Sequence, residues 1–167
     1  MEEYVISKQD LRKWCSIPVD ELATHPERKM DLMMGEDKAL LQEKVGNMIT
    51  DEVIAHNKEG KKTVWILPGG IGGVYDVFIR RVNEERISLK NLYVFHVDQW
   101  LDWEYRLFPV TNLRFSMRGK MTQTFYAKID PELNVPEDQR FFPDPATPDL
   151  IDQRIQELGG VDTTLGG

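Results

Sequence analysis

The chain has 167 residues, of which 41% are hydrophobic and 29% are charged, which is typical of one globular domain. Its 21 basic and 28 acidic residues give a formal net charge of −7, so the surface repels a phosphate backbone and nucleic acid is not expected as a partner. The apolar runs are far shorter than the roughly 20 residues of a membrane-spanning helix, and no secretory signal precedes them, so no membrane association is expected.

Residues 1–35 are expected to form an N-terminal extension of short helices, one beginning after Ser7 and one near Pro18. The single cysteine of the chain, Cys15, cannot form an internal disulfide. We expect it to be a half-buried, unreactive thiol, which fits a reducing, cytoplasmic location.

The clearest pattern follows this extension. Apolar residues repeat at helical spacing over residues 36–57, which predicts a helix. Residues 63–67 and 92–97 are almost wholly apolar and predict two strands buried on both faces, with a glycine-rich loop and a helical pattern from about Val74 between them. Two buried strands joined by one crossover helix must be parallel. Residues 36–167 therefore predict an α/β domain with a doubly wound, Rossmann-like parallel sheet in a three-layer sandwich.

Weaker patterns follow the second strand. They predict a helix over 112–121, a strand over 125–129, a connecting loop over 131–148 and a short helix over 150–158. Residues 161–167 have the pattern of a third strand that runs into a glycine turn, where a further loop at the same edge of the sheet would begin. We therefore expect the domain to be truncated after this strand.

Four glycines lie in the loop between the first strand and its helix. The candidate binding residues of this loop are Gly69, Gly70, Ile71, Gly72 and Gly73. Glycine lets the backbone approach a ligand closely, and the next helix begins with free amides, so the loop suits a phosphate group. The alternative is a loop that only needs positive φ angles. The pattern matches neither the P-loop nor the dinucleotide-binding fingerprint, so neither ATP nor NAD is expected.

Asp98 directly follows the second strand and is the candidate catalytic residue. Because parallel strands end at the same edge of a sheet, we expect Asp98 to lie near the glycine-rich loop. Trp100 and Trp103 are expected to shield the carboxylate partly from water, which suits it to accept a proton at neutral pH. The alternative is an aspartate that caps its own loop. His96 is expected to be a core residue rather than a ligand contact.

A basic segment follows. Residues 106–128 contain five basic residues and no acidic one: Arg106, Arg114, Arg118, Lys120 and Lys128. Arg114 and Arg118 are four residues apart and would share a helix face, either to grip an anionic substrate or as a solvated surface. No histidines and carboxylates have the spacing of a metal site, so no metal is predicted.

Together these motifs resemble the glucosamine-6-phosphate deaminase family, which is related in fold to the 6-phosphogluconolactonases. The resemblance rests on Leu67-Pro68 with the glycine-rich loop and Tyr75, and on residues 87–91 leading to the Val-Phe-His-Val-Asp-Gln-Trp run at 94–100. Residues 161–167 are similar to the strand and glycine pair before the family's Gly-x-Gly-x-x-Gly-His-Ile-Ala-Phe-Asn-Glu-Pro signature. The chain resembles about the amino-terminal half of the family's domain.

The resemblance implies a cofactor-free conversion of glucosamine 6-phosphate to fructose 6-phosphate and ammonia, in carbohydrate metabolism. The glycine-rich loop would bind the sugar phosphate, and Asp98 would match the family's aspartate that moves a proton between C2 and C1. The family's ring-opening histidine belongs to the signature that would follow Gly167, so turnover by this chain alone is not expected.

Two departures from the family pattern keep other functions open. The glycine-rich loop lacks the hydroxyl side chains usual in the family, and the family's Asp-Glu-Tyr is Asp98-Gln99-Trp100 here. The alternatives are a 6-phosphogluconolactonase-type hydrolase and a non-catalytic regulator or fragment that binds a sugar phosphate. Whether the chain forms a homo-oligomer is also left open.

Overall fold

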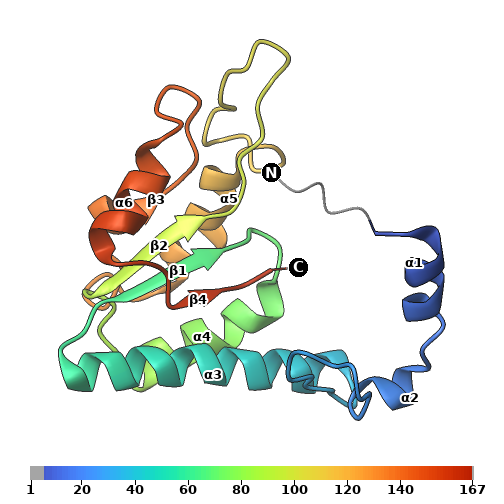
Figure 1. Cartoon of the computed structure of the whole chain (residues 1–167). Coiled ribbons are helices and arrows are strands. Elements are labelled where there is room, and N and C mark those ends of the chain that lie inside the picture. The colour runs from blue at the N-terminus through green and yellow to red at the C-terminus, as the bar shows by residue number, and fades with distance from the viewer. Residues whose placement is uncertain (1–5, 167) are drawn as a thin grey trace. The chain divides into compact units, whose positions relative to one another are not determined.

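Figure 1 shows a computed structural model of the chain, in which residues 6–166 are described. The chain divides into two compact units, Met1–Leu41 and Gln42–Gly167. The described part of the first unit contains two short helices, α1 (Lys8–Cys15) and α2 (Val19–Leu22), neither of which has a buried residue. Residues 6–41 are nearly all exposed to solvent and none of them is buried, so they form no hydrophobic core that could shield a thiol.

The first helix begins where the sequence predicts it. The Ser7 hydroxyl oxygen accepts a hydrogen bond from the backbone amide of Asp10 at 3.0 Å, which caps α1. Cys15, by contrast, is exposed at the end of this helix. The expectation of a half-buried thiol was therefore wrong.

The second unit is built on a parallel four-stranded sheet with the strand order β3-β2-β1-β4. Its strands are β1 (Thr63–Leu67), β2 (Leu92–His96), β3 (Arg140–Phe141) and β4 (Thr163–Thr164). Its helices are α3 (Lys38–Glu59), which belongs to this unit from Gln42 on, α4 (Gly72–Glu84), α5 (Met117–Thr124) and α6 (Leu150–Leu158). Two short 3-10 turns, η1 (Tyr126–Lys128) and η2 (Glu137–Gln139), complete the unit. The predicted fold class, an α/β sandwich with a parallel sheet, is confirmed.

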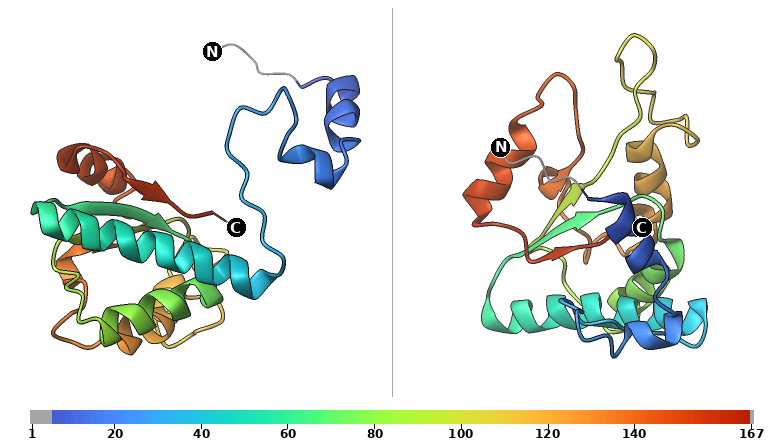
Figure 2. Two further views of the ribbon diagram at one scale, coloured as in Figure 1. Left: turned by 90° about the horizontal axis from the view of Figure 1, so that it is seen from below. Right: turned by 45° about the vertical axis from the view of Figure 1, so that its right-hand side comes forward.

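Helices cover both faces of this sheet. In both Figure 1 and the right-hand view of Figure 2, α3 and α4 lie below the strands, whereas α6 lies on their left side, away from α3 and α4. The handedness of crossovers explains this arrangement. The connections from β1 to β2 and from β2 to β3 run in one direction across the sheet and place α4 and α5 on one face, whereas the connection from β3 to β4 runs back and places α6 on the other.

The core lies mainly between the sheet and the lower helices. Trp65 in β1 is completely buried and packs edge to face against Phe78 of α4, with ring centroids 5.3 Å apart. Its indole nitrogen donates a hydrogen bond to the Glu52 carboxylate at 2.7 Å, so the polar edge of the ring has a partner. A short strand buried on both faces must be almost wholly apolar, which is why β1 was evident in the sequence.

Three predicted elements differ from the structure. The connecting loop expected over 131–148 contains the 3-10 turn η2 and the strand β3, which pairs in parallel with residues 94 and 95 of β2. A strand of two residues is too short to show a pattern of apolar residues in the sequence. Residues 125–129 do not form a strand, because Phe125 and Tyr126 are both buried in one core with ring centroids 5.0 Å apart, whereas neighbouring residues of a strand point to opposite faces. The helix expected over 112–121 begins only at Met117, after a series of turns. None of the helices in the described residues has the length and apolar character needed to cross a membrane.

Candidate functional site

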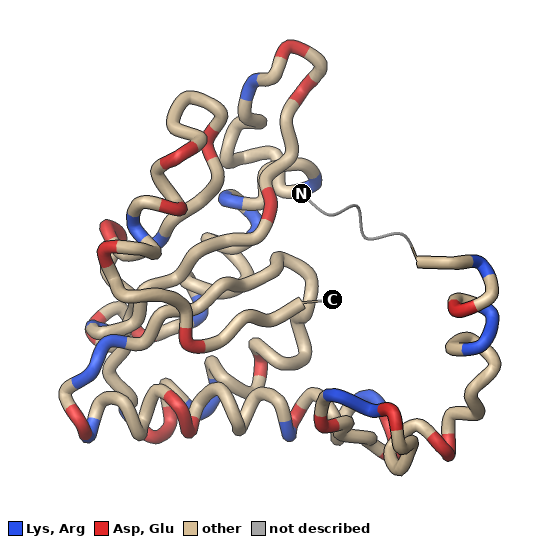
Figure 3. Tube along the Cα trace, in the orientation of Figure 1, with Lys and Arg blue, Asp and Glu red and all other residues tan. Residues whose placement is uncertain are grey.

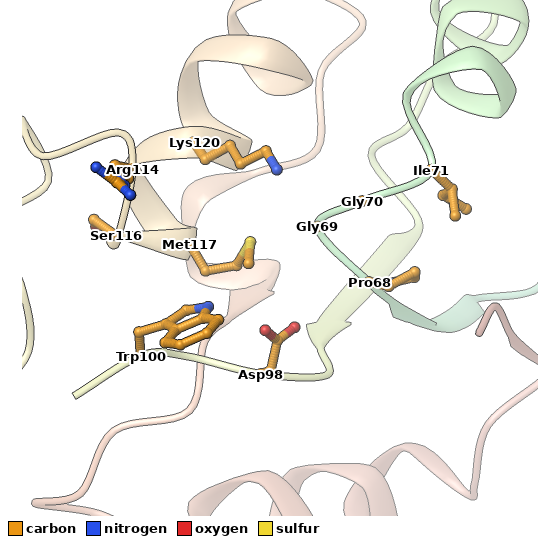
Figure 4. Close-up of a pocket in the computed structure, with 10 residues that line it drawn as sticks. All are labelled: Pro68, Gly69, Gly70, Ile71, Asp98, Trp100, Arg114, Ser116, Met117 and Lys120. Atoms are coloured by element: carbon orange, nitrogen blue, oxygen red, sulfur yellow. The ribbon is translucent and has the colours of Figure 1, made fainter. Parts of the chain in front are cut away.

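A cavity of about 380 Å³ opens at the carboxyl ends of β1 and β2 (Figure 4). Three segments form its walls: the loop after β1, the residues after β2, and the residues that lead into α5. The lining residues are Pro68, Gly69, Gly70, Ile71, Asp98, Trp100, Arg114, Ser116, Met117 and Lys120. The structure thus places Asp98 and the first three candidate residues of the glycine-rich loop in the same cavity.

The loop is anchored by the first turn of the helix that follows it. The Tyr75 hydroxyl donates a hydrogen bond to the Pro68 carbonyl oxygen at 2.5 Å. Burial raises the pKa of Tyr75, so its hydroxyl remains protonated and able to donate. None of the loop glycines has a positive φ angle, so left-handed backbone geometry does not explain them. Gly69 instead allows a close approach, because a Cβ there would lie 1.9 Å from the Met117 sulfur.

The last two candidate residues of the loop lie outside the cavity lining. Gly72 and Gly73 are the first residues of α4, and a Cβ on Gly73 would lie 2.2 Å from the Gln42 side-chain oxygen of α3. Gly73 therefore serves helix packing. No side chain caps α4, and the backbone amides of residues 70–73 make no hydrogen bond within residues 6–166. They remain available to an anion.

Asp98 is more exposed to water than the sequence analysis predicted from the two nearby tryptophans. The residue is exposed, and Trp100 and Trp103 are themselves 56% and 85% exposed, so the expected shielding by tryptophan is absent. Its carboxylate has no hydrogen bond or ion pair to any described residue. Figure 4 shows it pointing into the space between Trp100 and Pro68, below Met117. The carboxylate is therefore free to meet a ligand.

The alternative role of Asp98, to cap its own loop, is performed by Asp102 instead. The Asp102 side chain accepts hydrogen bonds from the backbone amides of Glu104 at 2.8 Å and Arg106 at 2.9 Å. These bonds, with that of Arg106 foremost, hold the pKa of Asp102 below its ordinary value. Sequence reasoning could not distinguish two aspartates four residues apart in one loop, because the turn geometry decides which of them reaches the amides.

The cavity contains two basic side chains, Arg114 and Lys120. Neither makes an ion pair within the described part of the chain, and Figure 3 shows no acidic residue along α5. Figure 4 shows the Lys120 ammonium directed toward the glycine-rich loop. The expected pairing of Arg114 with Arg118 on one helix face was wrong, because α5 begins after Arg114 and the Arg118 guanidinium lies over the Phe142 ring at 5.5 Å.

Lys120 and Met117 were not candidate site residues from the sequence. They are three residues apart in the first turn of α5 and so share a helix face, a relation that depends on where the helix begins. The start is set by Ser116, whose hydroxyl accepts a hydrogen bond from the Gly119 amide at 3.1 Å. In the sequence, only Ser116, a residue type that often caps helices, indicated locally that the helix begins here.

His96 lies beneath the site rather than in it. It is 3% exposed, its Nε2 lies 3.0 Å from the Tyr126 hydroxyl oxygen, and its ring stacks on Phe142 with centroids 3.9 Å apart. Burial lowers the pKa of His96 to about 3, so it is neutral at physiological pH. The expectation of a core histidine is confirmed. Among the described residues, no group of three histidines, cysteines or carboxylates is arranged to hold a metal ion.

Comparison with known proteins adds a structural relationship. No protein-family model matches the chain, and no curated protein matches it in sequence. Among the solved structures, 16 chains match. One is a monomeric glucosamine-6-phosphate deaminase described as a missing link of the NagB superfamily, with a TM-score of 0.62 and 20% sequence identity over 80% of this chain and 53% of that one. The chain spans about half the length of this neighbour, with which it shares its α/β fold.

Proposed function

We propose that the cavity binds a sugar phosphate and that Asp98 transfers a proton between adjacent carbons of the bound sugar. The reaction is the conversion of glucosamine 6-phosphate to fructose 6-phosphate and ammonia. One observation carries the proposal: a carboxylate without a partner shares a cavity with an uncapped glycine-rich loop and two basic side chains without carboxylate partners. The shared fold with a glucosamine-6-phosphate deaminase supports it.

The cavity suits a phosphate at the end that faces α4. The free amides at the start of α4 and in the preceding loop can donate to phosphate oxygens, and the helix dipole favours negative charge there. Lys120 adds a positive charge from the facing helix and is directed toward the same loop. Backbone amides and a lysine together can bind phosphate without the hydroxyl side chains that are absent from this loop.

The position of Asp98 suits proton transfer on the sugar. In the open-chain aldose, the C2 hydrogen is acidic because the adjacent C1 carbonyl stabilises the electron pair left behind. Asp98 takes this proton and returns it to C1, while the C1 oxygen is protonated to the alcohol and C2 becomes an iminium carbon. Water then adds to C2 and ammonia leaves, which yields the ketose. Each step is acid–base chemistry that a positioned carboxylate and water can perform.

The basic residue on α5 provides a test of binding. We expect Lys120→Met to weaken binding of glucosamine 6-phosphate about tenfold, or about 1.4 kcal/mol, because one charge–phosphate contact is lost while the aliphatic stem is kept. The matched control is Lys128→Met, which removes a lysine that pairs with Asp76 at 3.2 Å outside the cavity. Titration calorimetry measures both. Equal affinities in the two variants would exclude Lys120 from the phosphate site.

Isotope exchange and hydrolysis by the wild-type chain distinguish the alternative functions. Exchange can start from the small amount of open-chain sugar that forms in solution, so this assay does not require ring opening by the protein. Exchange of solvent deuterium into the sugar supports the isomerase and deaminase reaction. Hydrolysis of 6-phosphogluconolactone without such exchange would favour the lactonase alternative. Binding of sugar phosphates with neither reaction would favour a non-catalytic regulator.

A further inference from the structure

Gln99 connects two walls of the cavity. It lies between Asp98 and Trp100, which both line the site. Its side-chain oxygen accepts hydrogen bonds from the backbone amides of Met117 at 2.8 Å and Arg118 at 3.3 Å. These are the first two amides of α5 and have no acceptor inside that helix. A single side chain therefore ties the segment that carries Asp98 to the start of α5.

The start of α5 is also in contact with the third wall. The Met117 sulfur occupies the space where a Cβ of Gly69 would otherwise lie, so this side chain packs directly on the glycine-rich loop. Lys120 follows one turn later on the same helix face. Moving the backbone of Met117 would therefore change the spacing between Asp98, the loop and Lys120 together.

The cap is also neutral. A glutamate could accept the same two amide hydrogen bonds, and its negative charge would interact favourably with the start of the helix. It would also place a second carboxylate beside Asp98, where it would oppose the binding of an anion near Arg114 and Lys120. The glutamine performs the structural role without this cost.

We propose that Gln99 is the positioning residue of this site, which holds α5 against the Asp98 segment and, being uncharged, keeps the cavity favourable to a doubly charged anion. The second part of the proposal rests on the proposed function, whereas the first part does not. Gln99 acts through Met117 and Lys120 and is not assigned a contact with the ligand.

Two variants separate position from charge, with inorganic phosphate as the probe. Gln99→Leu removes the acceptor, so the amides of Met117 and Arg118 should exchange with solvent at least tenfold faster by NMR, and phosphate affinity should fall about fivefold. Gln99→Glu keeps the acceptor, so exchange should stay as in the wild type. Its phosphate affinity should be about fivefold lower than that of the wild type at low salt, and this difference should vanish in about 0.5 M salt, where the Debye length is only about 4 Å.

The control is Gln123→Leu, which makes the same replacement at an exposed position of α5. Unchanged exchange of the two amides in Gln99→Leu would overturn the positioning role. If Gln99→Leu does not fold, Gln99→Asn replaces it, since its shorter side chain cannot reach both amides, and the same result is expected. Phosphate affinity of Gln99→Glu equal to that of the wild type at low salt would overturn the charge role. If the wild type binds no phosphate, the proposed function and the charge role both fail, and amide exchange alone decides the positioning role.

Discussion

Asp98→Asn should slow the exchange of solvent deuterium into C1 of fructose 6-phosphate by 10² to 10⁴, about 3 to 5 kcal/mol in the barrier. The amide keeps the size of the side chain and a hydrogen-bonding oxygen, yet it cannot accept the proton that must move between C1 and C2. Phosphate affinity should stay within about threefold, because the loop and Lys120 supply it. Proton NMR of the sugar in deuterated buffer measures the exchange, and titration calorimetry measures the affinity.

The ketose is the better substrate for this measurement, because its exchange needs neither the release nor the addition of ammonia. A suitable control is Asp76→Asn, which makes the same chemical change at a carboxylate paired with Lys128 outside the cavity. Equal exchange rates in the wild type and Asp98→Asn would remove Asp98 from the proposed role. Exchange in neither protein, with phosphate binding intact, would instead support a regulator that binds the sugar phosphate without reaction.

The buried histidine gives the second large effect, on stability in acid. The pKa of His96 is lowered from 6.5 to about 3 in the folded chain, because burial disfavours the charged ring. The unfolded chain therefore binds more protons below pH 6.5, and the free energy of unfolding falls as the pH falls through the window from about 6.5 to 3. At about 1.4 kcal/mol per pH unit, the loss between pH 6.5 and 4.5 is about 2 to 3 kcal/mol. From about one pH unit above 6.5 the histidine contributes no pH dependence, because it is then neutral in both states.

This contribution can be isolated with His96→Gln, which leaves a polar partner for the Tyr126 hydroxyl but does not titrate. We expect the variant to lose about 2 to 3 kcal/mol less than the wild type between pH 6.5 and 4.5, measured by urea unfolding. Carboxylates whose pKa is lowered in the folded chain, such as Asp102, are common to both proteins and cancel in the comparison. Parallel stability curves would show that His96 is not held neutral in the folded protein.

The strands at the centre of the sheet could be predicted because their signal is local. β1 and β2 are buried on both faces, so nearly every residue in them must be apolar, and five-residue apolar runs bounded by glycine or polar residues are easy to recognise. The parallel pairing then followed from the crossover helix between them. That pairing placed Asp98 and the loop after β1 at one edge, so half of the candidate site could be located from the order of residues alone.

The α5 wall of the site could not be located in this way. The start of α5 depends on Gln99, which is 18 residues before Met117 in the chain, and on a serine cap inside a run of turns. Local spacing therefore extended the helix too far toward the N-terminus and paired Arg114 with Arg118. Local spacing also could not show that Met117 packs on Gly69, because the two residues are far apart in the sequence, one in the loop after β1 and the other at the start of α5.

By itself, the sequence determined the α/β class, the two central strands and the positions of Asp98 and the glycine-rich loop at their ends. These features follow from which residues are buried and how the strands are connected, and both can be inferred from the order of apolar and polar residues. Only the tertiary structure decided that Asp98 is exposed, that Gly73 packs against α3, and that Lys120 rather than Arg118 faces the loop. The reason is physical: exposure and side-chain direction depend on where a helix begins and what packs beside it, and contacts between distant segments set both.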